Sequence, residues 1–171
     1  MCPEPSNPED FLAEEPVERK PFVLRYEGPS LILVFGPPGF AEDLARRVTP
    51  FEAVVGVDRE DFLGSTSRID AVTRRRGSAF VDCSALTKRE RQAITRLCGE
   101  QDTELTALMF EETKNTPYPP PGTAADRRAY AQYRRTRDDL FVRTRYSHEG
   151  FASLQVLTPV NVRDLERIEF A

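Results

Sequence analysis

The feature that most constrains the fold is an apolar run that leads into a glycine-bounded turn and then into a helical pattern. Residues 31–35 read Leu-Ile-Leu-Val-Phe, and the turn occupies residues 36–39. Apolar residues then recur at four-residue spacing, as on one face of a helix: Phe40, Leu44 and Val48. Since continuous apolar strands are typical of parallel sheets covered on both faces, this stretch predicts a buried strand that feeds a helix.

The turn itself contains half of a phosphate-binding motif. In the pattern G-x-x-x-x-G-K-[ST], backbone N–H groups wrap the phosphates, while a lysine and a hydroxyl neutralise phosphate and hold magnesium. The chain has the first half of such a loop, Gly36, Pro37, Pro38 and Gly39. Glu42 and Asp43 stand about where the lysine and the hydroxyl belong. We therefore expect a phosphate-loop fold without ordinary triphosphate binding. As alternatives, the two acids occupy a solvated first helical turn or hold a metal in a rebuilt site.

Strand and helix patterns alternate along the rest of the chain. Further strands are predicted at 22–26, 53–57, 78–81, 105–110, 154–157 and 167–170. Helical patterns lie between them, including one that Thr87 and Glu90 start as a capping box and an arginine-rich one at 123–138. Alternation with long crossovers predicts an α/β fold: a three-layer, mainly parallel sheet with helices on both faces.

Polar residues collect where the predicted strands end. The ligand site of a parallel sheet lies at the carboxyl ends of its strands. Four polar segments fall at that edge: 36–43, 58–61, 82–84 and 111–115. Residues 111–122, which include four prolines, predict an extended excursion after the fourth strand.

Composition predicts one folded domain preceded by an acidic arm. Residues 1–20 contain four prolines and scattered acids, so we expect a disordered acidic arm, followed by a single domain at 21–171. No apolar run approaches the ~18 residues of a membrane span, and the first residues do not resemble a secretory signal. We expect a cytoplasmic protein without membrane association. Three unpaired cysteines favour neither a disulfide framework nor a metal site.

Arginines cluster between residues 127 and 145, with tyrosines interleaved. Such a set is either a solvated helix face or a surface that grips single-stranded nucleic acid by phosphate contact and base stacking. The candidate nucleic-acid-binding residues are Arg127, Arg128, Tyr130, Tyr133, Arg134 and Arg135.

Five short motifs carry a resemblance to a known family. They are Gly36-Pro-Pro-Gly39, Leu44-Ala-Arg-Arg47, Asp58-Arg-Glu-Asp61-Phe62, Asp82-Cys-Ser-Ala-Leu-Thr87-Lys-Arg-Glu90-Arg91 and Glu149-Gly150-Phe151. Together they resemble the P-loop kinase domain of polynucleotide 5′-hydroxyl kinases and related AAA-type nucleotide kinases, over about residues 31–157.

The resemblance implies roles for several residues, and the departures imply losses. Glu60 takes the place of the general base, and Asp82 is a second catalytic candidate. Leu63 stands where the family has an arginine thought to hold the acceptor phosphate. The lid arginines are unmatched after the fourth strand, where the chain reads Thr113-Lys-Asn-Thr-Pro117.

Three functions follow as hypotheses. The first is a kinase-fold protein without ATP-dependent catalysis, acting as a binding or regulatory module on nucleic acid or on a protein partner, with no cofactor. The second is an active polynucleotide or nucleoside kinase with a non-standard phosphate loop, which would use ATP and magnesium. The third is a structural component of a larger assembly.

Overall fold

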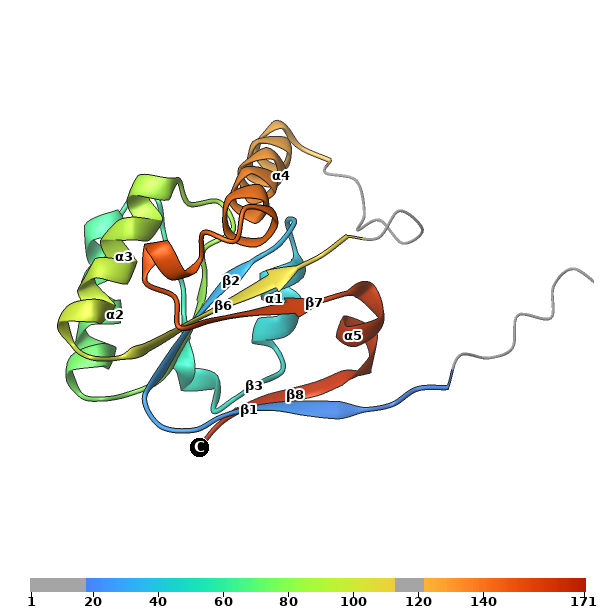
Figure 1. Ribbon diagram of the computed structural model, residues 1–171, viewed down its shortest axis with the longest axis horizontal. Coiled ribbons are helices and arrows are strands. Elements are labelled where there is room, and N and C mark those ends of the chain that lie inside the picture. Colours follow the sequence, from blue (N-terminus) through green and yellow to red (C-terminus); the bar gives the residue numbers. More distant parts are fainter. Residues whose placement is uncertain (1–17, 113–121) are drawn as a thin grey trace, which may run out of the picture.

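The computed structural model describes residues 18–112 and 122–171, and its central element is a five-stranded sheet (Figure 1). The strand order is β4-β5-β2-β6-β7, and every neighbouring pair is parallel. The strands are β2 (Ser30–Phe35), β4 (Val54–Val55), β5 (Ala79–Asp82), β6 (Glu104–Phe110) and β7 (Ser153–Leu157). The first strand of this set, β2, therefore lies at the centre of the sheet, between β5 and β6.

A second sheet is built from both ends of the described chain. Its three strands run parallel in the order β1-β8-β3. They are β1 (Phe22–Tyr26), β3 (Val48–Thr49) and β8 (Leu165–Phe170). Strands near 22–26 and 167–170 were predicted, but their pairing was not, because nothing local in the sequence connects segments so far apart.

Helices complete the layers. The longer ones are α2 (Phe62–Arg74), α3 (Lys88–Glu100) and α4 (Ala124–Arg137), and the short ones are α1 (Phe40–Ala45) and α5 (Pro159–Asp164). A π-helical turn, η3 (Asp138–Val142), follows α4, and two 3₁₀ turns are η2 (Phe51–Ala53) and η4 (Ser147–Glu149). The predicted strand at 53–57 is wrong in extent, because η2 occupies its start and only Val54 and Val55 pair with β5.

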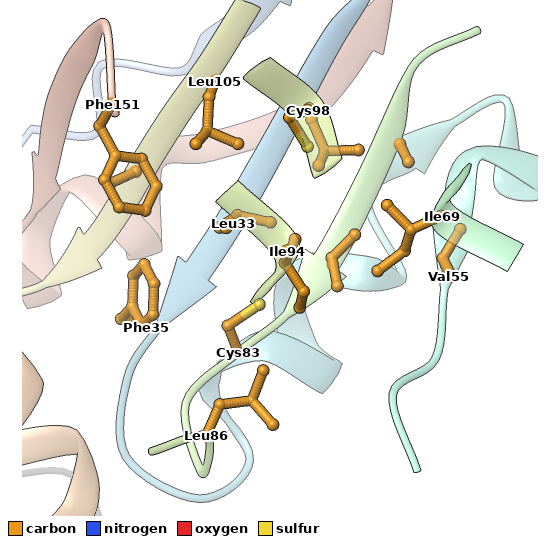
Figure 2. Packing of buried hydrophobic residues seen from close by; sticks show 14 of the residues in the cluster. Leu33, Phe35, Val55, Ile69, Cys83, Leu86, Ile94, Cys98, Leu105 and Phe151 are labelled. Atoms are coloured by element: carbon orange, nitrogen blue, oxygen red, sulfur yellow. The ribbon is translucent and has the colours of Figure 1, made fainter. Parts of the chain in front are cut away.

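Alternate residues of β2 serve opposite cores. Leu31, Leu33 and Phe35 pack in the core under α2, α3 and α4, together with Ile69, Ile94 and Tyr133. Figure 2 shows Leu33 and Phe35 in this core, with Cys83 and Ile94 beside them. Ile32 and Val34 point to the other core, which α1, α5 and the second sheet cover. All six residues of β2 are buried, as the unbroken apolar run predicts.

The predicted fold class is confirmed. The chain is α/β, with two parallel sheets flanked by helices, and is consistent with a three-layer, P-loop-like fold. The acidic arm lies outside the described residues except for its last three, 18–20, and most of the proline-rich excursion lies outside them too. Within the described ranges, no helix combines the length and apolar character needed to cross a membrane.

Candidate functional site

The predicted phosphate loop connects β2 to α1, but its backbone offers little to an anion. The Gly36 N–H donates to the Ser84 hydroxyl at 3.0 Å, and Pro37 and Pro38 have no N–H. The Phe40 N–H donates to the Pro37 carbonyl at 3.1 Å. The ring of Phe40 also fills the space beside Gly36, where an added Cβ would lie 2.1 Å from a ring carbon. The loop is therefore closed by its own contacts.

The two acids that replace the lysine and the hydroxyl of the motif diverge in space. Both lie in the first turn of α1, as the solvated-turn alternative has it. Glu42 is exposed and borders a pocket beside the loop. Asp43 accepts from Arg47 Nη2 at 2.9 Å, and Arg47 Nη1 donates to the Leu165 carbonyl at 2.7 Å. Asp43 thus helps to join α1 to the start of β8 and does not line this pocket, so its inclusion among the phosphate-loop residues is wrong.

The loop pocket is a cavity of about 380 Å³ with an acidic lining. Three carboxylates contribute to it, from Glu42, Asp82 and Asp126, and its described lining contains no lysine or arginine. The lining residues are Gly36, Pro37, Pro38, Gly39, Glu42, Asp82, Ser84, Ala85, Asp126 and Ala129. Among the residues that the structure describes, no group of three or more His, Cys, Asp or Glu side chains is arranged to hold a metal ion.

Asp82 lies at the carboxyl end of β5, where its carboxylate accepts from the Ser84 N–H at 2.9 Å. Burial raises the pKa of Asp82, and the negative charge of Glu42 raises it further, against the opposing effect of the Ser84 hydrogen bonds. The side chain still reaches solvent on the side of the loop pocket. Asp82 therefore sits where a catalytic carboxylate would be needed, beside two other acids.

The second catalytic candidate, Glu60, lies in a turn that mainly supports helix α2. The Asp58 carboxylate accepts from the Glu60 N–H at 3.0 Å, and the Asp61 carboxylate caps α2 by accepting from the Gly64 N–H at 3.1 Å. Glu60 itself is exposed and does not line the loop pocket. The structure therefore does not bring Glu60 and Asp82 together in one cavity.

A second cavity, the arginine pocket, adjoins the loop pocket and has the opposite charge. It measures about 450 Å³ and lies between α4 and the start of α3. Three arginines contribute to it, and two alanines belong to both pockets. Its lining is Arg59, Ala85, Thr87, Ala125, Arg128, Ala129, Ala131, Gln132 and Arg135. An acidic and a basic cavity thus share one wall, formed by Ala85 and Ala129.

The arginines of this pocket differ in how they are held. Arg59 Nη2 pairs with Glu90 Oε1 at 3.1 Å, and Glu90 belongs to the capping box of α3. Within the described part of the chain, Arg128 and Arg135 form no ion pair, and both are exposed. Sequence reasoning missed Arg59 as a binding residue, because it lies between acids; its placement depends on the fold.

The tyrosines of α4 do not match the predicted nucleic-acid surface. Tyr133 is fully buried and donates its hydroxyl to the Phe110 carbonyl, so the prediction that it stacks on a base is wrong. Tyr130 donates to the Glu112 carboxylate, and the Arg134 guanidinium lies 4.6 Å above its ring. Tyr130 and Arg134 are thus already engaged, whereas Arg127, Arg128 and Arg135 are exposed.

The lid position of the resembled family has no described counterpart, since Thr113 to Pro117 lie outside the described residues. No protein-family model matches the chain, and no curated protein matches it significantly. The chemistry of the site therefore has to be argued from the two pockets themselves. The loop pocket disfavours an anion, and the arginine pocket favours one.

Proposed function

We propose that the chain is a kinase-fold protein without ordinary ATP-dependent catalysis and that it binds single-stranded nucleic acid at the arginine pocket. The observation that carries the proposal is the position of Arg128 and Arg135 on the wall of a cavity of about 450 Å³. Both arginines are exposed, and neither forms an ion pair with any other described residue. Guanidinium groups that lack a carboxylate partner are free to take phosphates.

The loop pocket argues against a bound triphosphate. A carboxylate about 4 Å from a phosphate charge costs about 4 kcal/mol for each pair of unit charges at an effective dielectric of 20. Glu42, Asp82 and Asp126 all face this cavity, and no cation among its described lining residues offsets them. Since the Gly36 N–H is bonded to Ser84, the backbone does not compensate either.

The arginine pocket has a second favourable field. Thr87, which caps α3, lies in its lining, so the pocket opens at the positive end of a 13-residue helix. Arg128 and Arg135 lie seven residues apart on α4, which corresponds to roughly 10 Å along the helix. A nucleic-acid strand places about three phosphates over such a length at the duplex spacing of ~3.4 Å.

A salt titration tests the proposal. Fluorescence anisotropy with a labelled oligothymidylate should report binding that weakens steeply with salt. Each phosphate of a single strand that an arginine neutralises contributes ~0.7 to the slope of log affinity against log salt. Replacing Arg128 and Arg135 by alanine should therefore reduce that slope by about 1.4.

The matched control replaces Arg75 and Arg76, two exposed arginines that line a different cavity. The variant Arg75→Ala/Arg76→Ala removes the same net charge and should leave the slope nearly unchanged. Equal losses for the two variants would reduce the binding to a general charge effect and contradict the proposal, as would the absence of binding at about 50 mM salt.

The active-kinase alternative retains one favourable observation, the raised pKa of Asp82 at the rim of the loop pocket. Isothermal titration with ATP and magnesium separates the two functions. We expect no micromolar binding, and label transfer from ATP to an oligonucleotide should stay at background. Binding together with transfer would replace the proposed function by the alternative.

A further inference from the structure

The first 17 residues of the acidic arm have a charge that matches the arginine pocket. They contain five acids, Glu4, Glu9, Asp10, Glu14 and Glu15, and no lysine or arginine. We infer that this segment docks in the arginine pocket and competes there with nucleic acid. The inference concerns the regulation of that pocket and rests on the proposed function for its physiological meaning.

The arginine pocket suits acids better than the other cavity that holds neighbouring arginines, Arg75 and Arg76. These two lie just after the carboxyl end of α2, where the helix dipole is negative, and Glu52 shares their cavity. Arg59, Arg128 and Arg135 lie at the positive end of α3, and the described lining around them contains no acid. Carboxylates are therefore favoured at the arginine pocket by both the side chains and the helix.

The arm is long enough to reach it. The described chain begins at Glu18, and 17 extended residues span up to ~56 Å at ~3.3 Å each. A domain of 171 residues has a radius of gyration of about 16 Å, which corresponds to a diameter of roughly 40 Å. The segment can therefore reach any part of the surface of its own domain.

Tethering makes weak contacts effective. A segment joined to its target has an effective concentration in the millimolar range for short flexible linkers, so several exposed ion pairs suffice to occupy the pocket. Phe11 and Leu12, which lie between the acids, can pack on the alanines of the lining, Ala85, Ala125, Ala129 and Ala131. Salt should release the segment, since exposed charges are screened within about 8 Å at physiological ionic strength.

Cys2 provides a specific probe for this contact. The chain has three cysteines, and Cys83 and Cys98 are 0% and 1% exposed. Burial raises the pKa of Cys98 to about 12 and that of Cys83 well above its usual range, so neither forms a reactive thiolate at neutral pH. A nitroxide label should therefore attach to Cys2 in the full chain.

The first measurement is paramagnetic broadening of backbone amides by the label on Cys2. We expect the strongest loss of signal at the arginine pocket, along α4 and at the start of α3. Arg128→Ala/Arg135→Ala or high salt should abolish it, and Arg75→Ala/Arg76→Ala should not. Uniform broadening, or broadening centred on residues 75–78, would overturn the inference.

The second measurement is oligothymidylate affinity of an arm-neutral variant, E4Q/E9Q/D10N/E14Q/E15Q. We expect affinity to rise about tenfold at low salt, because a tethered competitor is removed, with the gain disappearing at high salt. The control neutralises five exposed acids of the body, E52Q/E100Q/D102N/E104Q/E166Q, and so changes the net charge equally. An equal gain for both variants would overturn the inference.

The two proposals fail in different ways. If the chain binds oligothymidylate and the arm-neutral variant binds it no better, the docked arm is excluded while the proposed function stands. If no form binds oligothymidylate but the label on Cys2 still broadens α4 in an arginine-dependent manner, the docked arm stands and the nucleic-acid function is excluded.

Discussion

Arg91 and Glu149, 58 residues apart in the sequence, form a buried two-point ion pair. Arg91 Nε and Nη2 donate to the two Glu149 carboxylate oxygens at 2.7 and 2.8 Å, and the side chains are 1% and 5% exposed. Arg91 Nη1 also donates to the Thr136 hydroxyl at 3.3 Å. One guanidinium thus joins α3, α4 and η4, and so fixes one wall of the arginine pocket relative to the other.

Breaking this ion pair from either side should destabilise the fold strongly. Arg91→Met or Glu149→Leu leaves a buried charge without its partner, which costs about 3–5 kcal/mol of unfolding free energy. The double variant Arg91→Met/Glu149→Leu removes both charges and should recover much of that loss. Urea unfolding measures all three.

An exposed pair supplies the control for this prediction. Arg74 pairs with Asp70 at 2.7 Å, with side chains 68% and 27% exposed, so Arg74→Ala should cost no more than about 0.5 kcal/mol. If Arg91→Met costs as little as Arg74→Ala, the buried pair is not a structural tie between the helices.

Tyr133 should affect stability and leave nucleic-acid binding unchanged. Tyr133→Phe removes the hydroxyl that donates to the Phe110 carbonyl and should lower the unfolding free energy by about 1 kcal/mol. The salt slope of oligothymidylate binding should stay as in the natural chain, because the ring is 0% exposed. A weaker affinity at an unchanged stability would restore Tyr133 to the binding surface.

Features set by neighbouring residues could be predicted from the sequence, and features set by distant pairing could not. The capping box of α3 is an example of the first kind: Thr87 accepts from the Glu90 N–H at 3.3 Å, and Glu90 accepts from the Thr87 N–H at 3.0 Å, as their spacing predicts. The parallel sheet likewise follows from apolar strands that alternate with helices. In contrast, the pairing of β3 with β8 joins Val48 to Ile168 and has no local signal.

The candidate site shows the same limit. Its position at the carboxyl ends of β2 and β5 follows from the general geometry of parallel sheets. The division into an acidic and a basic cavity does not, because it depends on α4 placing Asp126 in one and Arg128 and Arg135 in the other. Tyr133 was assigned to the exposed face because arginines surround it in the sequence, and a helix with few apolar residues gives a weak indication of its buried side.

Asp82 should make stability depend on pH in an unusual direction. Because the pKa of the folded carboxyl is raised, the native state binds this proton more tightly than the unfolded chain does. The contribution of Asp82 to stability is therefore present below the ordinary aspartate pKa and falls as the pH rises through the raised value. Asp82→Asn, which can still accept from the Ser84 N–H, should be more stable than the natural chain at neutral pH.

Urea unfolding across the pH range checks this prediction. The gain from Asp82→Asn should shrink towards about pH 3, where the natural carboxyl is protonated. Glu60→Gln, at the other predicted catalytic carboxylate, is the control, and as an exposed substitution it should stay within about 0.5 kcal/mol at every pH. A gain for Asp82→Asn that is largest at low pH would contradict the assigned direction.

Restoring the missing half of the phosphate motif should not restore a kinase. Glu42→Lys/Asp43→Ser returns a lysine and a hydroxyl to the first turn of α1, but Pro37 and Pro38 still lack N–H groups and the Gly36 N–H still donates to Ser84. Leu63 remains 81% exposed where the resembled family has its acceptor-binding arginine. Groups that stabilise a transition state act jointly, so one restored part contributes little alone. Label transfer from ATP to a 5′-hydroxyl oligonucleotide should stay at background while thermal unfolding shows a folded protein, and robust transfer would instead locate the entire defect at Glu42 and Asp43.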